Sequence, residues 1–259
     1  DRLPRLLTLD DLPRQGTTIE SGQHEISGVR TLFNPQPTNG IVYMDLGFDL
    51  KTLPRELLPY VPIFSRALTQ TGTSKQDFVA LSQRIGRATG GVSVTRLVSP
   101  IVDSDEAAAH LVVRGKAMLD KTTDLLAILT DILNDARLSN RERIRQIVSE
   151  DKARFEAGLV PAGHQFVFSR LRASMHEADW LTEQLGGISQ LFFLREISKR
   201  IDNNWDSVLA ALEAIREHLI NANAAVINIT AEPEAWEGLA NDLTRFIDGL
   251  SRHSFVLAD

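Results

Sequence analysis

The 259-residue chain contains no cysteine, and only 6% of its residues are aromatic. Without cysteine it can form neither a disulfide scaffold nor a thiol nucleophile. No apolar run approaches the roughly 18 residues that span a bilayer, so the sequence predicts no membrane partner. Lysine and arginine are scattered, and the net charge is −6. The basic stripe that contacts phosphates is therefore missing, and no nucleic-acid partner is predicted.

The chain does contain enough apolar material for a large core. Hydrophobic residues make up 43% of the sequence and charged residues 24%, a composition typical of globular proteins. Because a folded chain of this length buries roughly three-quarters of its surface, it can form one large domain or two small ones. It begins with Asp1 rather than methionine, and we therefore expect a piece of a longer chain.

Strand-like sequence occupies the first part of the chain and recurs later. Residues 1–16 contain two prolines and little periodicity, which indicates a connector. Strand-like texture then runs from Thr17 to Asp49 and includes a half-buried strand at 41–48. Further strands are predicted at 92–98, 109–118 and 224–230.

Helical spacing dominates most of the remaining sequence. A helix is predicted around residues 57–68, although Pro59 and Pro62 delay its regular part. Gly72 is expected to end this helix, and Ser74 to cap the next one. Further helical segments are predicted around 125–133, 144–148, 189–220 and 233–250. This order of strands and helices predicts an α+β fold with a helix-rich C-terminal part.

No self-contained active site is visible in the sequence. Gly86–Gly91 lacks the middle glycine of the dinucleotide fingerprint, and we interpret it as a helix stop before a strand. The six histidines include no pair at the helical zinc spacing. Asp103, Asp105 and Glu106 form an acidic cluster for which calcium binding is one interpretation, and acidic turn residues the favoured one. A small-molecule site assembled from distant residues stays a minor alternative.

Several segments resemble one protein family. The most specific are Gln36–Met44 (QPTNGIVYM), Thr52–Phe64 (TLPRELLPYVPIF) and Leu68–Gly72 (LTQTG), with weaker similarity at Thr89–Ser93, Gly158–His164 and Leu185–Ser189. They resemble the C-terminal half of presequence proteases, the falcilysin-like branch of the pitrilysin/insulinase zinc metallopeptidases. The resemblance covers most of the chain.

The resemblance implies a particular place in a larger enzyme. Those proteases resemble four copies of one α+β unit, each a mostly antiparallel sheet packed against several helices, and only the first carries the inverted His-x-x-Glu-His zinc motif. This chain resembles the third unit. Residues 1–16 are then the end of the linker between the two halves of the enzyme, and 17–259 are a single non-catalytic domain.

The zinc-motif positions are substituted in this chain. When Gly72 is set against the glycine that follows the motif, Ile63 and Ala67 occupy the two histidine positions and Arg66 occupies the glutamate position. These side chains can pack a core but can neither hold zinc nor activate water. Glu150, in a stretch that resembles Glu-Arg-x-Val-Ile-x-x-Glu, is a possible remnant of the third ligand. A structural role, as an exposed helix residue or a partner of Arg66, is the favoured interpretation.

Two functions of different classes follow. The first is a non-catalytic domain of a zinc metallo-endopeptidase that degrades short unstructured peptides, forming part of a closed peptide chamber and of the contact between halves. Its partners would be the catalytic N-terminal half and the fourth domain of the same chain, with zinc in the parent enzyme and no cofactor here. The alternative is a stand-alone peptide- or partner-binding module. The expected location is the cytoplasm for a bacterial protein or an organelle matrix for a eukaryotic one.

Overall fold

The computed structural model describes Thr8, Asp11 and residues 19–254. In that part of the chain the strands are β1 (Gly22–Ile26), β2 (Val29–Pro35), β3 (Ile41–Asp49), β4 (Val92–Pro100), β5 (Ala107–Met118) and β6 (Ala225–Ala231). The α-helices are α1 (Val61–Gln70), α2 (Phe78–Ala88), α3 (Thr122–Asp135), α4 (Arg141–Leu159), α5 (Gly163–Arg172), α6 (Glu177–Gly186), α7 (Ile188–Asn203), α8 (Trp205–Leu219) and α9 (Trp236–Asp248). The connector predicted at 1–16 lies almost entirely outside the described residues.

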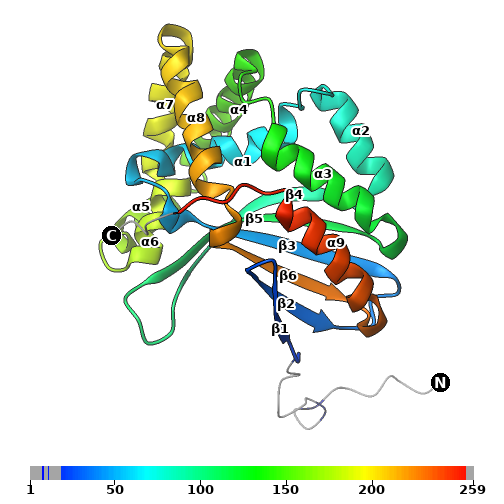
Figure 1. The fold of residues 1–259 in the computed structure, drawn as a ribbon. Helices are drawn as coiled ribbons and strands as arrows, with labels where there is room; N and C mark the ends of the chain where they lie inside the picture. Colours follow the sequence, from blue (N-terminus) through cyan, green and yellow to red (C-terminus); the bar gives the residue numbers. More distant parts are fainter. Residues whose placement is uncertain (1–7, 9–10, 12–18, 255–259) are drawn as a thin grey trace, which may run out of the picture.

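The strands form one sheet in the order β1-β2-β6-β3-β5-β4. Every neighbouring pair is antiparallel except β2 and β6, which run parallel. The sheet therefore brings β6, from near the C-terminus, between two strands from the start of the domain (Figure 1). The α+β fold with a mostly antiparallel sheet is confirmed.

The two faces of the sheet differ in polarity because successive side chains of a strand point to opposite sides. In β3, Val42, Met44, Leu46 and Phe48 are buried on one face. The opposite face carries half-buried and exposed residues from four strands: Asn34, Asn228, Thr230, Tyr43, Asp45, Arg114 and Lys116. We call this second side the open face.

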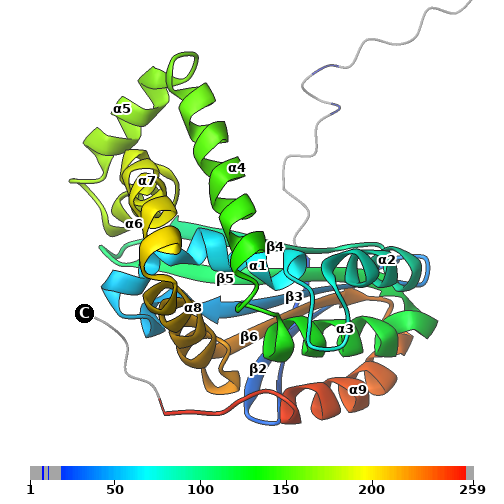
Figure 2. The ribbon, with the colours of Figure 1, turned by 90° about the horizontal axis from the view of Figure 1, so that it is seen from above.

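Helices cover the apolar face (Figures 1 and 2). Leu125 of α3 packs against Gly115 of β5, and Trp236 at the start of α9 stacks on Phe33 of β2 with ring centroids 4.6 Å apart. Helices α4 and α5 project away from the sheet at one end, with α4 packed against α1 and α7 (Figure 2). In the described part of the chain, no helix is both long and apolar enough to cross a membrane.

Two local predictions need correction. Ser74 does not cap α2, because Asp77 does so by accepting a 2.8 Å hydrogen bond from the Ala80 N–H. The Ser74 N–H and hydroxyl instead donate to Asp135 at 3.0 and 2.6 Å, which ties the turn after α1 to the end of α3. The helical block predicted at 189–220 is also divided into α7 and α8, since Asn204 adopts a φ of −152°.

Gly72 ends α1 as predicted, in a conformation that favours glycine. Its φ is +77°, and a Cβ there would lie 2.6 Å from the carbonyl oxygen of Gln76. A side chain would therefore meet both backbone strain and a backbone clash.

Replacing Gly72 by alanine should lower the free energy of unfolding by about 1–3 kcal/mol, because strain and clash act together. Gly86 in α2 is the matched control, since a Cβ there meets no atom within 4 Å. Gly86→Ala should be neutral or stabilise by up to about 1 kcal/mol. Urea unfolding followed by circular dichroism measures both variants, and equal effects would contradict the account of Gly72.

Candidate functional site

Helix α1 is the buried centre of the helical layer. A short 3-10 segment, η3 (Arg55–Tyr60), contains Pro59 and leads into it, and Pro62 lies in its first turn, where the missing N–H costs little. The regular helix therefore begins late, as predicted. Ile63 and Ala67, four residues apart, are both fully buried in the core. Neither side chain carries an atom that can coordinate a metal.

Helix α4 packs against α1 with a stripe of buried residues at helical spacing: Ile144, Ile147, Val148 and Asp151. The side chain of Asp151 is only 10% exposed. A charged group so deeply placed among aliphatic residues is costly unless it is paired.

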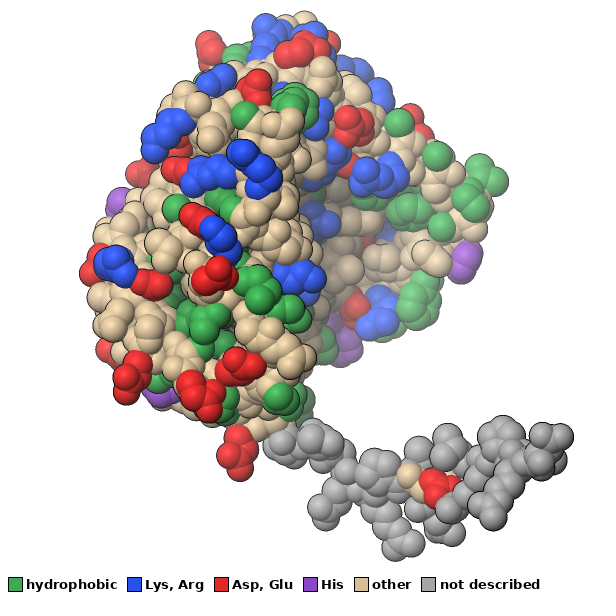
Figure 3. Space-filling view, turned by 90° about the vertical axis from the view of Figure 1, so that its right-hand side faces the viewer, with side chains coloured by type: hydrophobic (Ala, Val, Ile, Leu, Met, Phe, Trp, Pro, Cys, Tyr) green, Lys and Arg blue, Asp and Glu red, His purple; other side chains and the backbone are tan. Residues whose placement is uncertain are grey.

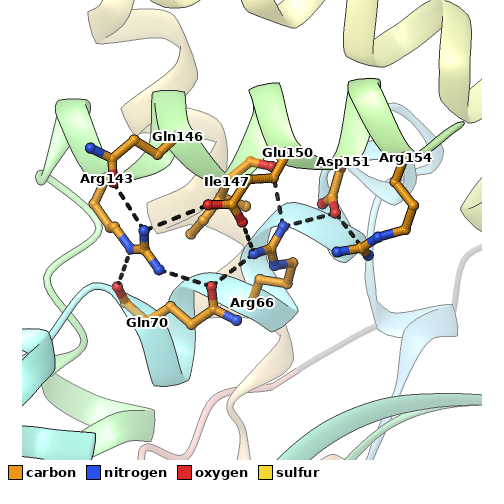
Figure 4. A network of polar contacts seen from close by, with 8 residues as sticks. All are labelled: Arg66, Gln70, Arg143, Gln146, Ile147, Glu150, Asp151 and Arg154. Atoms are coloured by element: carbon orange, nitrogen blue, oxygen red, sulfur yellow. Dashed lines mark hydrogen bonds and ion pairs between the residues drawn. The ribbon is translucent and has the colours of Figure 1, made fainter. Parts of the chain in front are cut away.

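Arg66 of α1 supplies the pairing (Figure 4). Its Nη1 lies 2.8 Å from Oδ1 of Asp151 and also donates to the carbonyl oxygen of Ile147 at 3.2 Å. Its Nη2 donates to Gln70 at 3.0 Å and pairs with the carboxylate of Glu150. The guanidinium is 20% exposed and joins α1 to two successive carboxylates of α4.

Arg143 and Arg154 extend this network on either side (Figure 4). Arg143 Nε donates to the carbonyl oxygen of Gln70 at 2.9 Å, and its guanidinium lies 4.7 Å from the ring centroid of Phe78. Arg154 pairs with Asp151 at 3.2 Å. The hydrogen bond from Arg66 holds the pKa of Glu150 below its ordinary value, and the nearby arginine charges act in the same direction.

The arrangement does not fit a zinc ion. A zinc site needs three or four converging nitrogen, sulfur or carboxylate ligands. Here Ile63 and Ala67 offer none, and the cationic Arg66 points at the one carboxylate, Glu150, that could serve. No group of three or more histidine, aspartate or glutamate side chains suited to a metal occurs among the described residues.

Sequence reasoning found part of this network and missed part of it. The proposed pairing of Arg66 with Glu150 is present. Asp151, the more buried partner, was missed, although its place in the apolar stripe of α4 was a usable signal. The acidic cluster at 103–106 does not converge, because Glu106 turns to Lys51, and the calcium interpretation finds no support.

The family of the chain follows from comparison with known proteins. Residues 1–197 match the family described as peptidase M16 (subfamily C) associated. The chain belongs to this family. We refer to it below as the peptidase-associated domain.

Curated relatives agree with this assignment. The domain is 36% identical over 242 residues to presequence protease 1, chloroplastic/mitochondrial, of Arabidopsis thaliana, covering 93% of this chain and 22% of the relative. It is 28% identical to the mitochondrial presequence protease of Danio rerio, covering 86% of this chain and 22% of that protein. The chain thus spans less than a quarter of the length of these relatives.

A solved structure shows the same fold. The inactive domain of a peptidase M16 from Pseudomonas fluorescens superposes with a TM-score of 0.65 at 13% identity, covering 92% of this chain and 52% of that one. Together, the comparisons identify a presequence-protease-like domain that matches one part of a longer peptidase chain.

Replacing Arg66 by methionine should lower the free energy of unfolding by about 2–4 kcal/mol, because Asp151 is left buried with only Arg154 to pair with it. The double variant Arg66→Met with Asp151→Leu should recover much of the loss. Arg195→Met is the control, since its pair with Glu156 at 3.0 Å is exposed and should contribute at most about 1 kcal/mol. Denaturant unfolding distinguishes these cases, and a silent Arg66→Met would contradict the assigned role.

Glu150 should make stability fall in acid. Its folded pKa is lower than the ordinary value of 4.5 that applies in the unfolded chain, so the unfolded state binds more protons across that range. The stabilisation is complete above that value and is lost as the pH falls through the folded pKa.

The stability difference between the wild type and Glu150→Gln should therefore shrink from about pH 6 to about pH 3. Glu217→Gln is the control, because Glu217 is exposed and has no ion pair in the described part of the chain. Thermal unfolding across that range measures both variants. A pH-independent difference for Glu150→Gln would refute its linkage to Arg66.

Proposed function

We propose that the peptidase-associated domain is a non-catalytic wall of the peptide chamber in a zinc metallo-endopeptidase that degrades short unstructured peptides. Ile63, Arg66 and Ala67 then occupy degenerate zinc-motif positions, and Glu150 the remnant of a third ligand position. One observation carries the proposal. Where catalysis would need converging metal ligands, an arginine joins α1 to α4 instead.

The open face supports a role as a chamber wall. It carries polar groups across neighbouring strands, including Asp45 and Arg114, whose Oδ1 and Nε lie 3.1 Å apart. A polar surface of this kind can contact peptide backbone and water without forming an apolar core. Its role would be to exclude folded proteins and to orient the peptide, which are contributions to catalysis by position.

Exposed apolar residues support contacts with other domains of the same parent chain. Several large hydrophobic side chains at the projecting end are more than half exposed: Val160, Val167, Phe168, Leu171 and Met175. Figure 3 shows this projecting part beyond a hollow lined by lysine and arginine side chains. An exposed apolar surface of this kind is typical of protein contacts. We propose that the catalytic half and the fourth unit supply those contacts.

The compartment is also a proposal. Relatives named as mitochondrial or chloroplastic support an organelle matrix for a eukaryotic parent. For a bacterial parent we propose the cytoplasm.

The isolated 259-residue chain should neither retain stoichiometric zinc after dialysis nor cleave an unstructured fluorogenic peptide. In the parent, the separately expressed catalytic half should gain activity when the half that contains this domain is added, because closure of the chamber needs both. Metal analysis and peptide hydrolysis with and without chelator measure these results. Chelator-sensitive hydrolysis by the isolated chain would overturn the proposal.

A further inference from the structure

A pocket of about 480 Å³ opens at the end of the sheet. It lies between the segment after β3, the β4–β5 loop, the α5–α6 loop and the first turns of α6. Its lining residues from these four segments include Leu53, Leu58, Asp105, Ser174, Trp180 and Leu181. The volume is within the range of sites that hold small ligands or inserted side chains.

The inner part of this pocket is apolar. Leu53, Leu58 and Leu181 are buried core residues that also line the pocket. Trp180 adds an aromatic wall, and the guanidinium of Arg55 lies 5.6 Å from its ring centroid. Such a lining favours an aliphatic or aromatic group over a hydrated ion.

The charge at the pocket is weighted toward acid. Lys51 Nζ lies 3.4 Å from Glu177 and 3.5 Å from Glu106, so two carboxylates already surround it. Glu177 is held in place by a 2.6 Å hydrogen bond from the Ala107 N–H. Asp105 also lines the pocket, and within the described part of the chain its carboxylate has neither a hydrogen bond nor an ion pair. A ligand with a cation beside an apolar group would satisfy both features.

Apolar surface continues beyond the pocket. Met175, at its edge, is 68% exposed, and Leu171 and Phe168 precede it at spacings of four and three along α5. No residue of α5 is buried in the described structure. A ligand longer than one side chain can therefore keep apolar contact outside the pocket.

We propose that this pocket binds a basic amphipathic peptide segment. One large apolar side chain enters between Leu53, Leu58 and Leu181, and a neighbouring lysine or arginine pairs with Asp105. The inference deepens the proposed function and rests on it, because a chamber wall with such a pocket would anchor the peptide as well as confine it. It requires no catalysis by this domain.

The first test is the binding of two labelled peptides to the 259-residue chain, measured by fluorescence anisotropy. One is a 15-residue peptide of leucine, arginine and serine, and the other has glutamate in place of every arginine. The arginine peptide should bind at least tenfold more tightly, and its affinity should fall as salt is raised. Equal binding of the two peptides, or binding of neither, would overturn the proposal.

Substitutions then locate the binding. Ser174→Phe fills the pocket from an exposed position and should weaken binding at least tenfold. Thr182→Phe adds the same ring at an exposed position of α6 outside the pocket lining, and should change binding less than twofold. Unfolding curves for both variants show whether each is folded. Equal loss in two folded variants would refute this location.

Charge is tested within one loop. Asp105→Asn should weaken binding of the arginine peptide about two- to fivefold, as expected for one exposed ion pair. Asp103→Asn removes the same charge from a residue outside the pocket lining, and asparagine tolerates the φ of +56° found there. The Asp103 variant should bind like the wild type, and equal losses would count against the assigned contact.

These outcomes are independent of the hydrolysis assay. If the isolated chain cleaves peptide, the proposed function fails whatever the pocket binds. If it neither cleaves nor binds, the pocket proposal fails and the chamber-wall proposal stands. Competition by an added sister domain without direct peptide binding would identify the pocket as a domain contact instead, which also overturns the peptide proposal.

Discussion

The ion pair between Arg66 and Asp151 is the contact on which the arrangement of α1 and α4 depends. Asp151 lies in the apolar stripe by which α4 packs on the rest of the domain, so its charge needs a partner from α1. Arg66 meets that need and binds Glu150 through its other terminal nitrogen. A guanidinium with fixed fork geometry can thus hold two helices in register without any metal.

This contact also fixes what surrounds it. With α1 held over the sheet, its Ile63 and Ala67 complete the core, and the segment before it places Leu53 and Leu58 at the edge of the pocket. The helical layer covers only one face of the sheet. Polar residues such as Asp45 and Arg114 therefore remain on the open face, where water or a peptide can reach them.

Local patterns predicted much of the fold because they report local physics. The end of α1 at Gly72 follows from a positive φ that glycine tolerates best. Ser74 and Asp77 are both good caps by type, and sequence could not choose between them because the choice depended on Asp135 of a distant helix. For Arg66, residue type showed that zinc ligands were missing, but pairing with Asp151 required the packing of α4 on α1.

The sequence by itself determined the α+β class, the family resemblance and the loss of metal-binding side chains at Ile63, Arg66 and Ala67, since each depends on residue identity and short-range spacing. Tertiary structure decided the parallel pairing of β2 with β6, the burial of Asp151 and the pocket beside Asp105. These features join segments far apart in the chain. Spacing along one segment carries no information about which distant surface will cover it, because that is settled by how the whole core packs.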